Sequence, residues 1–200
     1  MDPSNDPYEA KLLSIVRGSD WLMGILETVR VCDPPDWLVG GGVVYKLVWN
    51  RLHSYPETAY IEDVDVVFCD PGDLSAEREH AIERDLSARR PDVLWEAKNQ
   101  AAVHLWYEKK FGYAVPPLHS SEEGVGANPG IATAVGVRLL ADGSLYIAEP
   151  MGLSDLFELV LRRNPRRVTP ELFRRWVAEK GIRERYPKVR VTEEARSAIW

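Results

Sequence analysis

Apolar residues follow two spacings along the chain, one typical of helices and one typical of strands. Between residues 8 and 31 they recur every three or four positions, with a break near Gly18, and this predicts two packed helices. Short runs rich in β-branched and aromatic residues predict strands, over residues 37–39, 61–68 and 93–98. Asp142-Gly143 is a strong hairpin signal, and it predicts two more strands on either side, over residues 133–140 and 144–148.

The remaining apolar positions predict further helices and a C-terminal appendage. Amphipathic spacing and capping residues predict helices over residues 43–53, 75–86, 154–161 and 169–180. The weakly patterned stretch 108–128 predicts a loop, with one helical turn around Ser120. We therefore predict an α+β fold, in which a mixed β-sheet has helices packed on one face. Residues 1–150 form its core with the N-terminal helices, and residues 151–200 form a small helical appendage of the same domain.

The charge of the chain does not indicate a general nucleic-acid-binding protein. The 200 residues carry a formal net charge of −6, so no global positive field attracts phosphate backbones. The charge is uneven, since residues 1–150 hold 13 Lys/Arg and 24 Asp/Glu whereas residues 151–200 hold 12 and 7. We interpret the basic segment first as a solvated helix face, and RNA binding is the alternative. Six arginines there are expected to be mostly exposed and to form a positive patch near a cleft: Arg162, Arg163, Arg166, Arg167, Arg174 and Arg175.

No segment has the pattern of a targeting or membrane-spanning sequence. Residues 1–7 are polar and acidic and lack the apolar stretch of a signal peptide. No apolar run reaches the length that crosses a bilayer. Cys32 and Cys69 lack metal-ligand spacing and suggest no disulfide framework. We expect a cytoplasmic protein that binds no membrane.

Three consecutive glycines mark the first candidate site. Gly40, Gly41 and Gly42 end one apolar run and open the helix predicted over residues 43–53. A helix N-terminus presents free N–H groups and a partial positive charge, and both favour a phosphate. Lys46 lies about one turn further on, where it either reaches that phosphate or is an ordinary exposed lysine. Gly41, Gly42 and Lys46 are therefore candidate nucleotide-binding residues.

Two carboxylates mark the second candidate site. Asp63 and Asp65 lie two residues apart in a predicted strand, so alternation puts them on the same face. Oxygen ligands of this kind suit Mg²⁺, which keeps its waters and bridges to substrate phosphates. The plain alternative is a polar strand end. A glycine phosphate site followed by an Asp-x-Asp strand predicts metal-assisted nucleotidyl transfer, with Mg²⁺ or Mn²⁺ bound by Asp63 and Asp65.

A third carboxylate, Glu96, interrupts the apolar run at residues 93–98. A carboxylate in such a place is costly unless it is paired, exposed or bound to a metal, and an edge-strand carboxylate in water is the plain alternative. Lys98 lies two residues further on and shares the face of Glu96 if the strand continues. There its ammonium group would neutralise charge that develops on a phosphate.

Six short runs, taken in order, resemble a known family. They are Gly-Gly-Gly-Val-Val (40–44), Val-Trp-Asn-Arg-Leu-His (48–53), Asp-Val-Asp-Val-Val-Phe (63–68), Lys-Asn-Gln-Ala-Ala-Val-His-Leu-Trp (98–106), Thr-Ala-Val-Gly-Val-Arg (133–138) and Gly-Leu-Ser-Asp-Leu-Phe (152–157). The chain resembles a bacterial nucleotidyltransferase-like family of unassigned role, in the superfamily of DNA polymerase β. The resemblance implies a third acidic residue on a neighbouring strand, and Glu96 is its best positional match. Glu96 would then orient the acceptor hydroxyl and accept its proton.

The sequence and the resemblance together predict an enzyme. It would transfer a nucleoside monophosphate from a nucleoside triphosphate (NTP) to an unknown hydroxyl acceptor, with Mg²⁺ or Mn²⁺ as cofactor and Asp63, Asp65 and Glu96 as catalytic residues. Gly41, Gly42, Lys46 and Lys98 would bind the nucleotide. The alternatives are a catalytically silent nucleotide-binding or regulatory module, and an RNA-binding protein of the same fold. Hydroxyls of sugars, antibiotics, proteins and RNA all suit the same chemistry, so the acceptor stays open.

Overall fold

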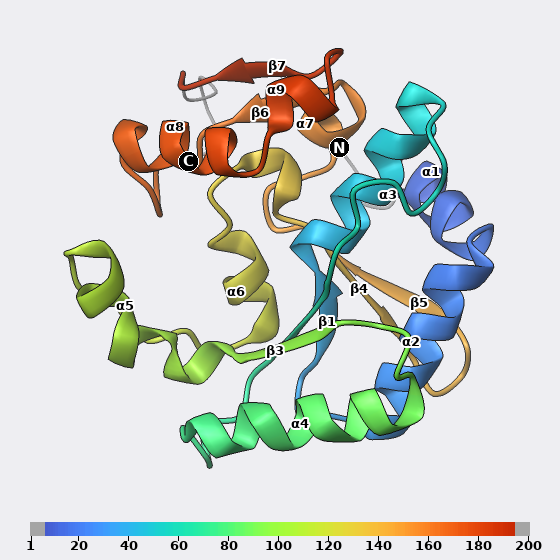
Figure 1. The fold of residues 1–200 in the computed structure, drawn as a ribbon, viewed down its shortest axis with the longest axis vertical. Coiled ribbons are helices and arrows are strands. Elements are labelled where there is room, and N and C mark those ends of the chain that lie inside the picture. Colours follow the sequence, from blue (N-terminus) through green and yellow to red (C-terminus); the bar gives the residue numbers. More distant parts are fainter. Residues whose placement is uncertain (1–6, 195–200) are drawn as a thin grey trace.

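The centre of the molecule is a five-stranded mixed sheet (Figure 1). The structure is a computed structural model, and it describes residues 7–194. The strand order is β3-β2-β1-β4-β5; β2 and β3 run parallel, and the other neighbouring pairs are antiparallel. The strands are β1 (Leu38–Gly40), β2 (Val64–Phe68), β3 (Trp95–Asn99), β4 (Gly136–Leu139) and β5 (Leu145–Ala148). The predicted α+β class and mixed sheet are confirmed.

One face of the sheet packs on helices and carries the main hydrophobic core. Alternate residues of β2 are buried in this core, namely Val64, Val66 and Phe68. The core is completed by α1 (Pro7–Arg17), α2 (Asp20–Cys32), α3 (Gly41–His53) and α4 (Ala76–Arg89). Ser19 caps the N-terminus of α2, since its Oγ accepts a hydrogen bond of 3.0 Å from the Leu22 N–H. No helix within residues 7–194 is both long and apolar enough to span a membrane.

The free edge of β3 is covered by two side chains of α4. The Ala97 N–H donates to Glu83 Oε1 at 3.0 Å, and the Asn99 N–H donates to Glu79 Oε1 at 2.8 Å. These bonds satisfy donors that an open strand edge would present to solvent. They also hold Ala97 and Asn99 toward the core, so Glu96 and Lys98 between them point to the opposite face.

The opposite face is partly covered by a short helix, α6 (Ser121–Gly126). Val125 of α6 forms a small apolar cluster with Leu38 and Ala148, and Val67 packs against it. The predicted helical turn near Ser120 is thus confirmed, but helices are not confined to one face of the sheet. Before α6 the chain forms α5 (Val103–Phe111), which Figure 1 shows at the side of the molecule, away from the N-terminal helices.

The C-terminal segment differs from the prediction in one helix and in a pair of strands. The helix expected over residues 154–161 is wrong, because α7 (Ser154–Phe157) is short and is followed by β6 (Val160–Arg162). Leu159 between them has φ 56°, a left-handed conformation that ends a helix. β6 pairs in parallel with β7 (Arg190–Thr192), so the appendage is not purely helical. Its other helices are α8 (Pro170–Glu179) and α9 (Ile182–Arg185).

Buried contacts join this segment to the body of the protein. The ring of Tyr186 lies 5.2 Å from that of Trp49 in α3, in an edge-to-face arrangement. The Tyr186 hydroxyl donates to Asn50 Oδ1 at 3.0 Å. Phe173 and Leu161 are fully buried in the same core cluster as the sheet. The segment therefore brings α8 close to the N-terminus of α3, and residues of both helices line one cavity.

Candidate active site

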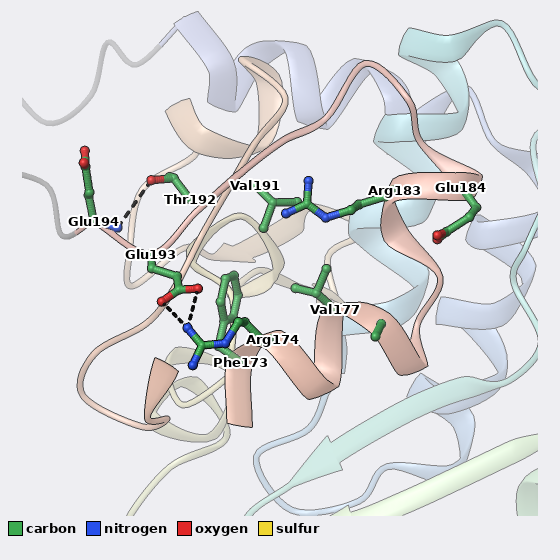
Figure 2. Close-up of a pocket in the computed structure, with 10 residues that line it drawn as sticks. Phe173, Arg174, Val177, Arg183, Glu184, Val191, Thr192, Glu193 and Glu194 are labelled. Carbon is green, nitrogen blue, oxygen red and sulfur yellow. Dashed lines mark hydrogen bonds and ion pairs between the residues drawn. The ribbon is translucent and has the colours of Figure 1, made fainter. Parts of the chain in front are cut away.

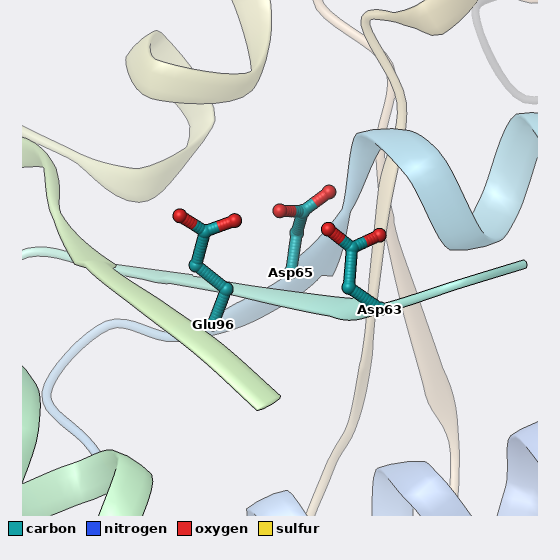
Figure 3. Close-up of side chains that lie close together, drawn as sticks. All are labelled: Asp63, Asp65 and Glu96. Carbon is teal, nitrogen blue, oxygen red and sulfur yellow. The ribbon is translucent and has the colours of Figure 1, made fainter. Parts of the chain in front are cut away.

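Three carboxylates meet on the face of the sheet that is opposite the main core (Figure 3). Asp65 and Glu96 are register partners in the parallel pair of β2 and β3, so their side chains stand next to each other. Asp63 lies two residues before Asp65, and alternation directs it to the same side. One carboxylate oxygen of each residue lies within 4.8 Å of the other two. The predicted same-face geometry of Asp63 and Asp65 is therefore present, and Glu96 faces the same space.

Asp65 is the electrostatically strained member of this group. Burial, and after it the charges of Asp63 and Glu96, raise the pKa of Asp65 to about 6. The Gly42 N–H bonds to the Asp65 carboxylate and acts in the other direction. Among residues 7–194 neither Asp63 nor Asp65 forms a salt bridge, and the charge of Lys180 offsets only part of the rise in the pKa of Asp65.

This donor set fits a hard divalent cation. All three residues offer carboxylate oxygens, all are partly exposed, and burial and the neighbouring carboxylates raise the proton affinity of Asp65. Mg²⁺ and Mn²⁺ prefer oxygen ligands and bind through a few carboxylates together with water and substrate phosphates. The residues present therefore fit the metal that the sequence predicts.

The glycines bring the N-terminus of α3 against the carboxylates. Gly41 has φ +41°, a left-handed conformation that favours glycine. A Cβ on Gly42 would lie 3.1 Å from Asp65 Oδ2, so a larger residue would press on that carboxylate. One part of the prediction needs correction, because the Gly41 N–H donates to the Val135 carbonyl at 3.1 Å and is not free for a phosphate. Gly41 contributes space at the site, and Gly42 contributes both space and an N–H.

Lys46 is buried, with 4% of its surface exposed, and is not the ordinary exposed lysine of the plain alternative. Burial lowers the pKa of Lys46, while the negative charge of Asp63 acts in the other direction. Its Nζ would lie 4.0 Å from a Cβ on Gly42, so the ammonium group is at the glycine turn. A buried cation in this position suits an anionic ligand.

Two cavities meet at the carboxylates. The smaller, about 160 Å³, has Gly41, Gly42, Lys46, Asp63 and Asp65 among its lining residues. We call it the glycine cavity.

The larger cavity, about 540 Å³, includes Asp65, Glu96 and Lys98, and we call it the aromatic cavity because of the rings described below. Lys98 lies 3.6 Å from Glu96 and 3.7 Å from Glu79, so it shares the face of Glu96 as predicted. It lines this cavity and not the glycine cavity. Both cavities have Gly41, Asn128 and Trp176 among their lining residues, so the two spaces adjoin each other at Asp65.

The glycine cavity also has lining residues that were not predicted, among them Asn128, Trp176 and Lys180. Asn128 comes from a stretch without clear periodicity, and its side-chain amide donates to the Thr133 carbonyl at 2.7 Å. Trp176 fits the apolar stripe of α8, and nothing in that spacing separates a cavity wall from a core residue. Lys180, an exposed residue after α8, adds a positive charge that lowers the pKa of Asp65. Only the three-dimensional approach of α8 to α3 identifies Trp176 and Lys180.

The predicted positive patch of mostly exposed C-terminal arginines is present only in part, because three of the six are exposed and two, Arg167 and Arg175, line the aromatic cavity. Arg162, Arg163 and Arg167 are partly buried, and Arg162 forms a salt bridge of 3.0 Å with the buried Asp155. Arg174 bonds to Glu193 at 2.9 Å, and Arg175 pairs with Glu179 at 3.4 Å. These partners all come from the C-terminal segment itself. Its own carboxylates therefore disperse the excess positive charge that the sequence concentrates there.

Another cavity lies away from the carboxylates. It measures about 600 Å³ and is bounded by α8, α9 and β7 (Figure 2). Arg174 and Glu193, which bond to each other, are among its lining residues. It contains neither the carboxylate group nor the glycine turn, so we do not assign the chemistry to it.

The comparisons with known proteins agree with this geometry. No curated protein matches the chain. A solved structure described as "The NMR structure of the protein reveals a CCA-adding enzyme head domain" is similar, with a TM-score of 0.78 and 26% sequence identity. The similarity covers 92% of this chain and 96% of that one. A family model described as nucleotidyltransferase matches residues 27–191. The match spans most of the chain and includes every residue of the carboxylate group and the glycine turn, and the chain therefore belongs to this nucleotidyltransferase family.

Proposed function

We propose that the protein is a metal-dependent nucleotidyltransferase that transfers a nucleoside monophosphate from an NTP to a hydroxyl group of an acceptor. The oxygen of the acceptor forms a bond to the α-phosphorus, the bond from that phosphorus to the bridging oxygen breaks, and pyrophosphate leaves. The hydroxyl proton passes to Glu96. One observation carries the proposal: three carboxylates from β2 and β3 converge within 4.8 Å beside a glycine turn that opens a helix.

In this proposal the two aspartates and the glycine turn hold the nucleotide. Asp63 and Asp65 bind Mg²⁺ or Mn²⁺, which supplies charge neutralisation for the phosphates. The glycine cavity takes the triphosphate, because Gly41 and Gly42 leave room beside Asp65. The positive end of α3 and the buried ammonium of Lys46 face that room.

Glu96 has the position of a general base. It stands next to Asp65 on the neighbouring strand but lines the aromatic cavity and not the glycine cavity. An acceptor hydroxyl that enters from this side meets Glu96 before it meets the α-phosphorus, as a proton acceptor requires. Lys98, 3.6 Å from Glu96, orients the carboxylate and adds positive charge on the same side.

Pyrophosphate release tests the proposal. The wild-type protein is incubated with each of the four NTPs, Mg²⁺ or Mn²⁺, and fractions of a metabolite extract, and we expect release that requires both metal and one fraction. Glu96→Gln should lower the rate by about 100-fold or more while nucleotide binding is retained, because it removes the base and not the metal ligands. The matched control Glu77→Gln changes an exposed carboxylate on α4 and should leave the rate unchanged. Equal rates for Glu96→Gln and the wild type would exclude Glu96 as the base.

A further inference from the structure

The aromatic cavity has a composition that differs from that of the glycine cavity. Four aromatic side chains line it, Trp106, Tyr107 and Phe111 of α5 and Trp176 of α8. Of these four aromatic side chains, the glycine cavity shares only Trp176, and its other lining residues are mostly polar. Because Glu96 lines only the aromatic cavity, the molecule whose hydroxyl reacts has this cavity for its binding site.

We propose that the aromatic cavity is the acceptor site, and that it selects a small acceptor which carries a planar ring and an anionic group. This inference rests on the proposed function, since it names the substrate class of the same site. A volume of about 540 Å³ lies in the range of small-molecule sites.

The rings form a fixed wall for a planar group. Tyr107 packs on Phe111 with centroids 4.4 Å apart, and its hydroxyl lies 3.0 Å from that of Tyr113. Trp106 lines the cavity and is 37% exposed, so part of its ring is accessible to a ligand. Offset stacking on such rings stabilises a planar ligand.

The charges of the cavity select an anion. Four cationic side chains line it against three carboxylates, and one of these, Asp65, is also a proposed metal ligand. Lys98 and Arg175 already pair with Glu96 and Glu179. Lys110 lies 5.5 Å from the ring centroid of Trp106, and Arg167 lies 4.2 Å from that of Tyr107.

Within residues 7–194 neither Lys110 nor Arg167 has a carboxylate partner, so both remain available to an anion held next to the rings. The same two charges disfavour a polycationic acceptor such as an aminoglycoside. A long RNA strand also fits poorly, because Arg162 and Arg174 outside the cavity are paired with carboxylates and the net charge is −6.

Ligand binding without metal or nucleotide tests this inference. The probe is phenyl phosphate, which joins a planar ring to an anion, and it is compared with benzyl alcohol, inorganic phosphate and kanamycin. Indole N–H signals in a ¹⁵N-labelled sample, assigned with Trp106→Phe and Trp176→Phe, report where each probe binds. We expect phenyl phosphate to shift the Trp106 and Trp176 signals with a Kd of about 1–10 mM, an affinity normal for so small a ligand. The Trp49 signal, whose N–H donates to the Leu156 carbonyl in the core, should not move.

Neighbouring residues provide the matched controls. Lys110→Gln should weaken the binding of phenyl phosphate by about fivefold, the effect of one partly exposed charge. Lys109→Gln changes the adjacent residue of α5, which does not line the cavity, and should leave the Kd unchanged. Both variants alter exposed side chains, so both should fold.

Several results would overturn the inference. They are no shift of the Trp106 and Trp176 signals, an equal loss in Lys109→Gln and Lys110→Gln, or binding of kanamycin at these signals as tight as that of phenyl phosphate. A ten-nucleotide oligouridylate that binds here more than about tenfold tighter, with a steep dependence on salt, would replace the small acceptor with RNA. The proposed function fails separately, since its test needs metal and NTP. Transfer without phenyl phosphate binding would reject only the acceptor class, and phenyl phosphate binding without transfer would reject only the chemistry.

Discussion

Asp65 connects every part of the candidate site. It is the register partner of Glu96, it accepts a hydrogen bond from the Gly42 N–H, and it lines both cavities. Its carboxylate is unfavourable in the free protein, because burial and two neighbouring carboxylates raise its pKa from 3.8 to about 6. Such strain is typical of residues that act on a ligand.

Asp65→Asn should therefore stabilise the metal-free protein near neutral pH. A raised pKa in the folded state contributes stability that is present below the unfolded pKa of 3.8 and is lost as the pH rises through about 6. Asparagine keeps the shape without the charge, so we expect a gain of about 1–3 kcal/mol in the free energy of unfolding at about pH 7.5. The gain should shrink toward zero below about pH 4, where the wild-type carboxyl is protonated in both states.

Urea denaturation in EDTA at the two pH values measures this difference. Asp92→Asn is the control, because Asp92 is exposed and its pairing with Arg90 lowers its pKa, so its replacement should not stabilise the protein at neutral pH. A gain for Asp65→Asn that is the same at both pH values would show that burial and charge do not act on Asp65 as described.

Gly42→Ala should impair ligand binding without preventing folding. The new Cβ would lie 3.1 Å from Asp65 Oδ2, so the carboxylate must move, whereas the φ of Gly42 is not positive and accepts alanine. We expect metal-dependent nucleotide affinity to fall by about tenfold or more. The control is Gly72→Ala in a surface turn, where the new Cβ would lie 3.4 Å from Asp70 Oδ1. Unchanged affinity in Gly42→Ala would remove the glycine turn from the site.

At the scale of elements, period-two alternation proved the most informative pattern. It placed Asp63 and Asp65 on one face of their strand, and Glu96 and Lys98 on one face of the next strand. The pattern works because each strand buries only its opposite face in the core. The run at residues 156–161 failed for the opposite reason. Leu156, Phe157, Val160 and Leu161 are all buried, so they show no period that separates helix from strand.

The walls of the aromatic cavity could not be predicted for a related reason. Trp106 of α5 and Trp176 of α8 are 70 residues apart in the sequence, and they approach each other only in the fold. Each helix has an ordinary apolar stripe, and the spacing of a stripe does not state what it faces. The prediction that the Gly41 N–H is free was wrong, because this N–H donates to the Val135 carbonyl. That carbonyl lies just before β4, and no local pattern in the sequence connects it to the glycines.

The contact between α9 and α3 makes a separate prediction. The Tyr186 hydroxyl donates to Asn50 Oδ1 at 3.0 Å in a buried environment. Tyr186→Phe leaves that oxygen without its donor and should lower the free energy of unfolding by about 1–2 kcal/mol in urea denaturation. Tyr146→Phe removes a bond to Glu122 at a partly exposed position and should cost less. An equal cost for both variants would mean that burial does not strengthen the contact of Tyr186.

At the scale of the whole molecule, the site is shared between the sheet and the C-terminal segment. β2, β3 and α3 supply the carboxylates and the glycine turn, while α8 supplies Trp176 and the adjacent Lys180. The acidic excess of the first 150 residues includes the carboxylate group, and three arginines of the last 50 residues, Arg162, Arg174 and Arg175, pair with carboxylates of that segment. Asp63 and Asp65 have no salt-bridge partner among residues 7–194, and a divalent cation would neutralise their charge.

The proposed metal-nucleotide site at the carboxylates is tested most directly by calorimetric titration of Mg²⁺ with ATP, GTP, CTP and UTP into the wild type and Asp65→Asn. We expect at least one Mg²⁺-NTP to bind the wild type and to bind far less to Asp65→Asn, although the variant is folded and more stable without metal. Glu96→Gln should bind like the wild type, because it changes the proposed base and not the two aspartates. Equal heats from the wild type and Asp65→Asn would contradict a metal-nucleotide site at these carboxylates. The protein would then have the fold of a nucleotidyltransferase without its chemistry at this place.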